Sequence, residues 1–189
     1  MITFTPLKED HFPLLLKWLM TPHVRAWWDQ DVPWTPELIE EKYGCYVQGF
    51  KRVRRTDSVI ERPVHAFVIE HTDTVSHKIP IGYIQYYDRY DWLPSDYAFE
   101  FKDFPKSLAA IDVFIGEESY IGKGIGSKAI DMFAHDHVLP HFDACMVDPD
   151  TINTNAIRAY QKAGFETGAI LKDGSITIMV IGKQDILTH

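Results

Sequence analysis

The stretch from Ile111 to Gly126 reads I-D-V-F-I-G-E-E-S-Y-I-G-K-G-I-G, and a helical pattern follows it. Its first part is apolar except for Asp112, as in a strand, and its last part is rich in glycine. Glycines allow a positive φ and let backbone N–H groups face outward. The first turn of the following helix adds N–H groups without acceptors and the positive end of the helix dipole. This order of strand, turn and helix predicts a site for a phosphate or a pyrophosphate.

A Walker A loop is excluded by the spacing of these glycines. That motif needs four residues between its first glycine and Gly-Lys, and then Ser or Thr to hold magnesium. Five residues separate Gly116 from Gly122, and Gly124 follows Lys123. The motif therefore fails at two positions.

A dinucleotide fingerprint is a closer match and stays an alternative. Gly124, Gly126 and Ala129 fit G-x-G-x-x-A, and Asp148 lies near the usual place of a ribose-binding acid. That fingerprint should begin directly after its strand, whereas Glu117 to Ile121 intervene here. A plain strand-to-helix turn is a further alternative, which explains one glycine well but three glycines poorly.

Composition limits the remaining classes of protein. With 189 residues, 46% of them hydrophobic, the chain is long enough for one domain with a sizeable core. Cys45 and Cys145 give neither a disulfide framework nor a metal-ligand spacing. We expect a cytoplasmic protein, because no signal peptide and no membrane span is recognisable. The net charge of −8 argues against a nucleic-acid partner and favours cationic ligands.

Apolar periodicity predicts a mixed α/β architecture. Thr35 followed by Pro36 marks a helix start, and the basic run Lys51 to Arg55 is expected to end that helix. Asp173-Gly174 marks a hairpin turn, and Gly164 a helix end. The predicted strands are 2–7, 64–70, 79–87, 109–115, 144–147, 165–171 and 175–181, and the predicted helices are 10–19, 23–28, 35–50, the segment after Gly124, and 155–163. We therefore expect one domain over residues 1–189 with a mixed sheet.

The order of elements and the loop resemble the GNAT acetyltransferases over nearly the whole chain. Their acyl-coenzyme A loop is usually written Q/R-x-x-G-x-G/A, and Gly124 and Gly126 fall at its fixed glycines. Ile121 departs from the pattern, which removes one side-chain contact and leaves the backbone donors. The resemblance implies acetyl-coenzyme A as co-substrate and no metal. The residues it implies for coenzyme binding are Val113, Phe114, Ile121, Gly122, Lys123, Gly124, Ile125, Gly126 and Asn155.

Several segments look more narrowly like the bacterial aminoglycoside 6′-N-acetyltransferases. They are H-V-R-A-W-W (His23 to Trp28), I-G-Y-I-Q-Y-Y (Ile81 to Tyr87), Ile111-Asp112, and D-P-D-T-I-N-T-N-A-I-R-A-Y-Q-K-A-G-F (Asp148 to Phe165). The portion A-x-x-x-Y-x-K-x-G-F (Ala156 to Phe165) of the last segment is shared by many GNAT enzymes and so indicates only the superfamily. The resemblance implies acetyl transfer to the 6′-amine of an aminoglycoside, and hence antibiotic resistance. Another acceptor, such as a siderophore-precursor hydroxylamine, and a non-catalytic coenzyme A-binding module stay open.

Acetyl transfer to an amine needs a neutral nucleophile, a donor to the developing oxyanion and a proton for the thiolate. Asp112 is the candidate for accepting the proton or orienting the amine, because Asp is disfavoured in strands. The alternative is an edge position facing water. Beside an ammonium Asp112 would be a weak base, so a water relay is also considered. Asp148 is the second candidate, or else a turn residue before Pro149.

The resemblance implies that Tyr160 is the general acid for the thiolate, although its spacing with Ala156 and Ala163 fits core packing equally. Asn155 either reaches the coenzyme or only caps its helix. The oxyanion is expected to meet a backbone N–H of the strand from Asp112 to Phe114.

Acidic and aromatic residues predict the acceptor site. Six acids and three bases lie from Asp88 to Asp112, and Tyr90 to Lys106 form a long insertion without periodicity. A polycationic amine fits such a lining, with aromatic faces covering sugar rings or ammonium groups. The expected contacts are Trp27, Trp28, Tyr83, Asp91, Trp92, Asp112 and Asp148. The alternative is a solvated loop over a core that contains Trp27 and Trp28. A monomer or a homodimer is expected.

Three histidines invite a metal interpretation that their spacing does not support. In a helix His135 and His137 point to different faces, and only His137 and His141 align. Because a third helical partner is missing, no metal site is predicted.

Overall fold

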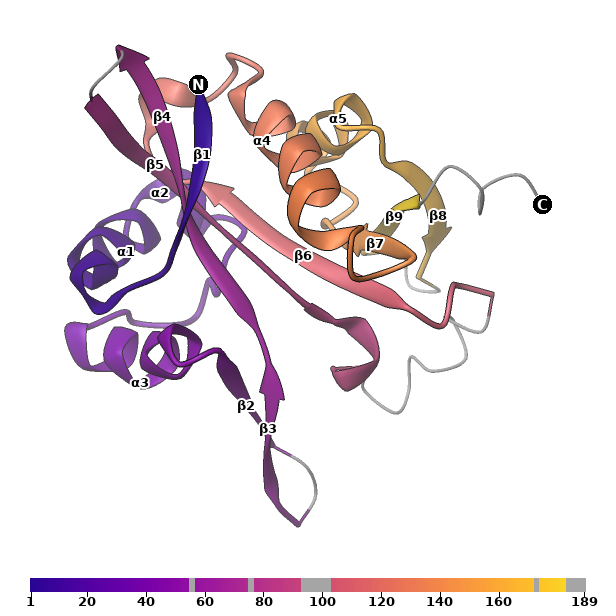
Figure 1. Cartoon of the computed structure of the whole chain (residues 1–189), viewed down its shortest axis with the longest axis horizontal. Helices are drawn as coiled ribbons and strands as arrows, with labels where there is room; N and C mark the ends of the chain where they lie inside the picture. Colours follow the sequence, from indigo (N-terminus) through magenta and orange to yellow (C-terminus); the bar gives the residue numbers. More distant parts are fainter. Residues whose placement is uncertain (55–56, 75–76, 93–102, 172–173, 183–189) are drawn as a thin grey trace. The chain divides into compact units, whose positions relative to one another are not determined.

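The computed structural model describes residues 1–54, 57–74, 77–92, 103–171 and 174–182. Its strands form a seven-stranded sheet of order β1-β4-β5-β6-β7-β9-β8 and a separate two-stranded sheet, β2-β3 (Figure 1). The chain divides into two compact units that interleave in sequence. The first unit contains Met1–Gln85 and Val113–Lys123, and the second contains Tyr86–Asp112 and Gly124–His189.

The first unit combines antiparallel strands with three helices. Its strands are β1 (Ile2–Pro6), β2 (Phe50–Arg54), β3 (Val59–Pro63), β4 (His65–Thr74) and most of β5 (His77–Asp88). Its helices are α1 (Phe12–Leu19), α2 (Pro22–Arg25) and α3 (Pro36–Val47), with short 3₁₀ turns η1 (Glu9–His11) and η4 (Glu118–Tyr120). β1 pairs with β4, where the Thr3 and Thr5 hydroxyls donate to Glu70 at 3.2 and 2.7 Å.

Helix α3 begins where the sequence predicts and ends earlier. The Thr35 hydroxyl accepts the Leu38 N–H at 3.3 Å, as an N-cap does. Gly49 has a φ of 86°, which ends the helical turn, and Phe50–Arg54 then form β2. The prediction that the basic run Lys51 to Arg55 ends a helix is therefore wrong for its described residues, which lie in a strand.

Strands β2 and β3 form a hairpin that the sequence analysis missed. Phe50 lies opposite Pro63 and Arg52 opposite Glu61 in its antiparallel register. The hairpin extends past α3 as a narrow ribbon (Figure 1). Its alternating exposed and half-buried residues are the period-2 pattern that the helix assignment overlooked.

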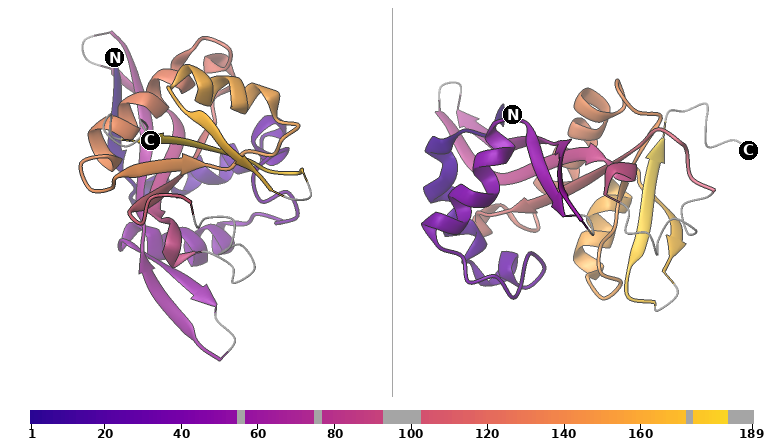
Figure 2. Two further views of the ribbon diagram at one scale, coloured as in Figure 1. Left: turned by 90° about the vertical axis from the view of Figure 1, so that its right-hand side faces the viewer. Right: turned by 90° about the horizontal axis from the view of Figure 1, so that it is seen from below.

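The second unit places helices against a mixed part of the sheet. It holds most of β6 (Leu108–Ile115), then β7 (Ala144–Val147), β8 (Glu166–Ile170) and β9 (Thr177–Gly182), together with the 3₁₀ turn η2 (Arg89–Asp91). Helices α4 (Ile125–Phe133) and α5 (Thr154–Lys162) lie side by side, and a π turn (Ala134–Val138) extends α4 (Figure 2). β7 runs parallel to β6 and antiparallel to β9. Within the described ranges, no helix has both the length and the apolarity that crossing a membrane requires.

Candidate active site

The glycine-rich turn has the conformation that its sequence predicts. Gly122 and Gly124 have φ of 74° and 75°, and a Cβ at either position would meet nothing within 4 Å. Glycine is therefore favoured by backbone conformation and not by crowding. Gly124 is the N-cap of α4, and Ile121 to Gly124 are all exposed. The turn thus offers solvent-facing backbone next to a helix N-terminus, which suits a phosphate group.

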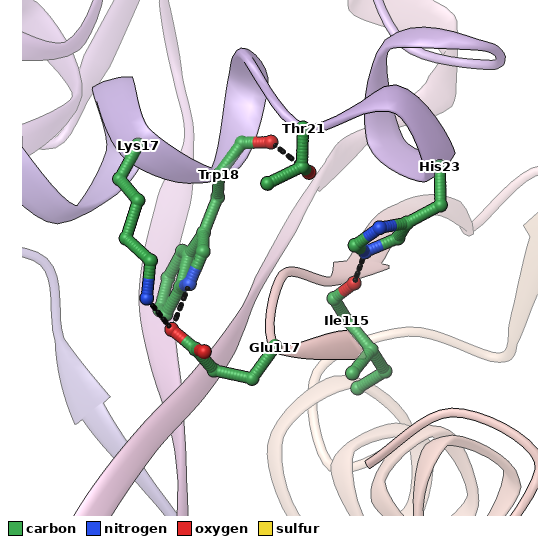
Figure 3. Close-up of polar contacts among 6 residues, drawn as sticks. All are labelled: Lys17, Trp18, Thr21, His23, Ile115 and Glu117. Atoms are coloured by element: carbon green, nitrogen blue, oxygen red, sulfur yellow. Dashed lines mark hydrogen bonds and ion pairs between the residues drawn. The ribbon is translucent and has the colours of Figure 1, made fainter. Parts of the chain in front are cut away.

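Glu117 fixes the chain just before this turn to helix α1. One of its carboxylate oxygens accepts hydrogen bonds from Lys17 Nζ at 2.5 Å and from Trp18 Nε1 at 2.8 Å (Figure 3). The hydrogen bond from Lys17, and then that from Trp18, lowers the pKa of Glu117. From the sequence alone Glu117 is only a residue between the strand and the glycines. An acid directly after a strand-ending glycine was the available signal.

Two further contacts hold the C-terminal end of β6, which belongs to the first unit. The Gly116 N–H donates to the Ile81 carbonyl at 2.8 Å, and a Cβ on Gly116 would lie 2.1 Å from the Trp18 ring. His23 Nε2 lies 3.0 Å from the Ile115 carbonyl oxygen (Figure 3). Gly116 is thus required by close approach to an aromatic ring, unlike Gly122 and Gly124.

Two aspartates follow the parallel ladder of β6 and β7. The last pair of this ladder is Ala110 with Met146. Asp112 lies two residues further along β6, and Asp148 is the first residue after β7. Both are half-buried. The edge-strand alternative for Asp112 is wrong, because β6 lies between β5 and β7 in the sheet.

Tyr160 on α5 lies within the electrostatic influence of both aspartates. Burial raises the pKa of Tyr160 well above its usual value, and the charges of Asp112 and Asp148 raise it further. Its side chain is 9% exposed, and its ring centroid lies 5.9 Å from that of Phe165. Tyr160 is therefore a core residue whose hydroxyl stays protonated close to two carboxylates, so the packing interpretation and the proton-donor interpretation are compatible.

Tyr87 and Arg89 complete this group, and the sequence analysis assigned neither of them. Burial, followed by the charges of Asp112 and Asp148, raises the pKa of Tyr87 well above its usual value, while Arg89 lowers it by its charge and a hydrogen bond. Arg89 Nη2 lies 3.7 Å from Asp148 Oδ2. We call these five residues, Tyr87, Arg89, Asp112, Asp148 and Tyr160, the aspartate–tyrosine cluster.

Asn155 does not cap helix α5. The N-cap is Asn153, whose side-chain oxygen accepts the Ala156 N–H at 3.2 Å. Asn155 lies in the first turn of the helix and is exposed. The capping alternative for Asn155 is therefore wrong, and its contact with a coenzyme stays a prediction.

The predicted acceptor-binding aromatics differ in exposure. In the first unit, the Trp28 ring lies 5.0 Å from Phe114 and 6.1 Å from Tyr83, while Trp27 is 46% exposed. Of the two adjacent tryptophans, Trp28 thus packs against other rings, whereas Trp27 is largely exposed. Tyr83 has no exposed surface, and its hydroxyl donates to Gln85 at 2.6 Å. Tyr83 stacks on Phe114 with ring centroids 5.5 Å apart, so its full burial in this structure argues against direct contact with an acceptor.

The acidic segment after β5 is described only at its ends. In the second unit, Asp88 caps η2 by accepting the Tyr90 N–H at 2.9 Å, and burial raises the pKa of Asp88. Asp91 is half-buried, and the Trp92 ring lies 5.6 Å from that of Tyr87. Trp92 thus lies against the aspartate–tyrosine cluster. Residues 93–102 of the predicted insertion lie outside the described residues.

The histidines after α4 are not placed to form a metal site with other described residues. His137 stacks on Phe133 with ring centroids 5.0 Å apart, and burial lowers its pKa. Among the described residues, no three His, Cys, Asp or Glu side chains are placed to hold a metal ion.

Comparison with known families identifies this arrangement. The family described as an acetyltransferase (GNAT) domain matches residues 8–172. The chain belongs to the GNAT acetyltransferases. As a member of this family the protein is an N-acetyltransferase, which is what its resemblance to the GNAT enzymes implies. A similar curated protein is the aminoglycoside N(6′)-acetyltransferase type 1 of Klebsiella pneumoniae, 27% identical over 190 residues, which cover 97% of this chain and 84% of that protein.

Solved structures of other acetyltransferases share the GNAT fold. The structure of AAC(6′)-Ib in complex with ribostamycin and coenzyme A superposes with a TM-score of 0.74 at 24% identity, covering 100% of this chain and 98% of that one. An aminoglycoside N(6′)-acetyltransferase from Legionella pneumophila has a TM-score of 0.65 at 19% identity, covering 97% and 93%. These similarities confirm the predicted fold class.

Proposed function

We propose that this GNAT enzyme transfers the acetyl group of acetyl-coenzyme A to the 6′-amine of an aminoglycoside, and so confers resistance. The observation that carries the proposal is that Asp112 and Asp148, which follow the ends of a parallel ladder, both act electrostatically on the protonated hydroxyl of Tyr160. Relatives named for this activity, and a similar structure holding an aminoglycoside with coenzyme A, support the choice of substrates.

The residues of the turn fit acetyl-coenzyme A, whose thioester supplies the activated acetyl group. Backbone N–H groups from Ile121 to Gly126 would hold its diphosphate, because the left-handed Gly122 and Gly124 leave the backbone exposed. Lys123 would add positive charge at the rim, and Asn155 at the exposed start of α5 is a further contact. A backbone N–H of Val113 or Phe114 would donate to the carbonyl oxygen as negative charge develops there.

The two carboxylates suit a cationic acceptor. An aliphatic amine reaches the site mostly as an ammonium, which Asp112 and Asp148 attract and orient. The same attraction makes either carboxylate a weak base, so a water molecule between Asp112 and the amine can carry the proton away. Half-buried Trp92, which belongs to the same unit as the two carboxylates, offers a face for a sugar ring.

Tyr160 is positioned to donate a hydrogen bond at neutral pH. Its raised pKa keeps the hydroxyl protonated, which donation to a leaving thiolate requires. The same shift disfavours complete proton loss from Tyr160, so stabilisation of the thiolate by a hydrogen bond is the larger contribution.

The proposal is tested by following thiol release from acetyl-coenzyme A. Kanamycin and ribostamycin should be acetylated, whereas a hydroxylamine and a simple alkylamine should react slowly. Faster transfer to the hydroxylamine would point to a siderophore-type acceptor. No transfer to any acceptor, with coenzyme A still bound in calorimetry, would indicate a binding module.

Asp112→Asn should lower kcat/KM by roughly 100-fold or more while coenzyme A binding stays unchanged. Asp136→Asn, an exposed aspartate of the same unit, is the matched control and should leave the rate unaltered. An Asp112→Asn enzyme with the wild-type rate would refute the role of this carboxylate.

We also propose a cytoplasmic location for the enzyme. Cys45 and Cys145 are both free thiols, which a reducing compartment maintains. Fractionation of cells that express the chain tests this location, and recovery from an oxidising compartment would contradict it.

A further inference from the structure

Arg89 places a positive charge among the carboxylates of the proposed acceptor site. It begins η2, directly after β5, and its side chain is only 13% exposed. Its Nη2 atom lies 3.7 Å from Asp148 Oδ2, and its guanidinium hydrogen-bonds the hydroxyl of Tyr87. The guanidinium is therefore held at the cluster from two directions and is not a solvated surface charge.

The cluster holds charges of both signs, and Asp148 is shared between them. The Arg89 guanidinium lies beside Asp148, and the two tyrosines are neutral. An ammonium group that approaches Asp148 therefore has to share this carboxylate with Arg89 and is repelled by the positive charge of Arg89.

We propose that Arg89 sets the charge selectivity of the acceptor site, so that a reacting ring with one ammonium is preferred over a ring with two. The inference rests on the proposed transfer to aminoglycosides and specifies which of them are good acceptors. Arg89 is a specificity-determining residue because its charge repels the second ammonium and its contact holds Asp148.

The size of the effect follows from the interaction between two like charges. At several ångströms' separation near a protein surface, their repulsion changes binding by on the order of tenfold once salt screening is allowed for. This effect should fall on KM, because it acts on the bound ground state as strongly as on the transition state.

The test compares kanamycin A, whose reacting ring carries a 2′-hydroxyl, with kanamycin B, which carries a 2′-amine at the same place. The wild-type enzyme should show the higher kcat/KM with kanamycin A. Arg89→Gln should raise the kcat/KM ratio of kanamycin B to kanamycin A about tenfold, through a lower KM for kanamycin B. Arg89→Lys should keep most of the wild-type preference, because it keeps the charge.

Two further variants serve as a substitute for Arg89→Gln and as a matched control. Arg89→Met keeps the apolar stem without the charge, so it replaces Arg89→Gln if that protein does not fold. Arg54→Gln removes an exposed arginine outside the cluster and should leave the ratio unchanged.

The outcomes separate this inference from the proposed function. Transfer to both drugs with the same ratio in Arg89→Gln or Arg89→Met as in the wild type would overturn the inference alone, as would a wild-type preference for kanamycin B. Transfer to neither drug would overturn the proposed acceptor class and the inference with it.

Discussion

Two regions of this enzyme use different physical means to hold their side chains. In the first unit, Trp18, Trp28, Tyr83 and Phe114 form an aromatic cluster with ring centroids 5.0 to 6.2 Å apart. In the second unit, the aspartate–tyrosine cluster gathers two carboxylates, a guanidinium and two tyrosines. One region depends on shape and apolar burial, and the other on a balance of charge.

Because of this difference, we expect the two regions to be sensitive to different kinds of substitution. Buried aromatic pairs contribute roughly 0.5–1.5 kcal/mol each beyond their area, so changes of volume in the aromatic cluster should lower stability. Half-buried carboxylates cost free energy unless they are compensated, and such groups gather at functional sites. Changes of charge there should alter rate and pH dependence more than the fold.

Among the variants that compare the two regions, Tyr160→Phe should give the largest effect on activity, with the fold left intact. Loss of the hydroxyl should lower kcat by about 100-fold, with little change in stability at pH 7. Tyr46→Phe, the same deletion on α3 of the first unit, should leave kcat within about twofold. A Tyr160→Phe enzyme with full kcat would show that this hydroxyl takes no part in transfer.

The same variant should change stability at high pH. Because the folded pKa of Tyr160 is raised, the unfolded chain loses this proton first, and the wild type should lose stability as the pH rises above about 10. Tyr160→Phe should lose less between pH 9 and pH 11 in urea unfolding, although Tyr87 retains part of the effect. An identical loss in both proteins would contradict the assignment.

Gly116→Ala should give the largest loss of stability in the aromatic region. A Cβ there would lie 2.1 Å from the fully buried Trp18 ring, so the free energy of unfolding should fall by about 3 kcal/mol. Gly44→Ala on α3 is the control, because its Cβ would meet nothing within 4 Å, and it should be neutral or stabilising. Equal midpoints in urea for both variants would refute the crowding argument.

Lys42→Met should lower the stability less than Gly116→Ala does. Lys42 lies beside two other aromatic rings of the first unit. Lys42 Nζ lies 2.6 Å from Asp29 and 5.1 and 5.5 Å from the ring centroids of Trp34 and Tyr43. About a third of each charged side chain is exposed, so the loss should be about 1 kcal/mol and should shrink in high salt. A loss independent of salt would assign the effect to packing.

Ile121→Gln should give the smallest effect and concerns only the turn. It restores a side chain common in GNAT loops, and one added hydrogen bond should strengthen coenzyme A binding about threefold in calorimetry. Ile152→Gln removes another exposed isoleucine, 75% exposed, and should leave binding unchanged. Weaker binding in Ile121→Gln would mean that the apolar side chain itself contacts the coenzyme.

Most of the fold could be predicted because its elements carry clear periodicity. β7 is found at the predicted residues 144–147, since a short buried apolar run fits no other element there. The end of α3 could not be predicted, because Phe50 continues the helical spacing of apolar residues. Only Gly49 and pairing with Val59–Pro63 decide that it is a strand.

The candidate site could be predicted from the sequence only in part. Asp112 interrupts an apolar strand and Asp148 follows one, whereas the resemblance to the GNAT enzymes is what indicates Tyr160. Arg89 and Tyr87 carry no such signal, because their importance comes from the neighbours that folding gives them. Glu117 was missed because its partners, Lys17 and Trp18, lie about a hundred residues away in sequence.

The pairing of β6 with β7 sets where the segment that carries Asp148 begins, independently of the loop that precedes β7. The ladder that ends at Ala110 and Met146 fixes that place, so insertions between α4 and β7 should be tolerated during evolution or engineering. Deleting one residue within β7 would instead bring Pro149 to the place of Asp148. Natural variation in this enzyme should therefore concentrate in connecting segments and spare the length of these two strands.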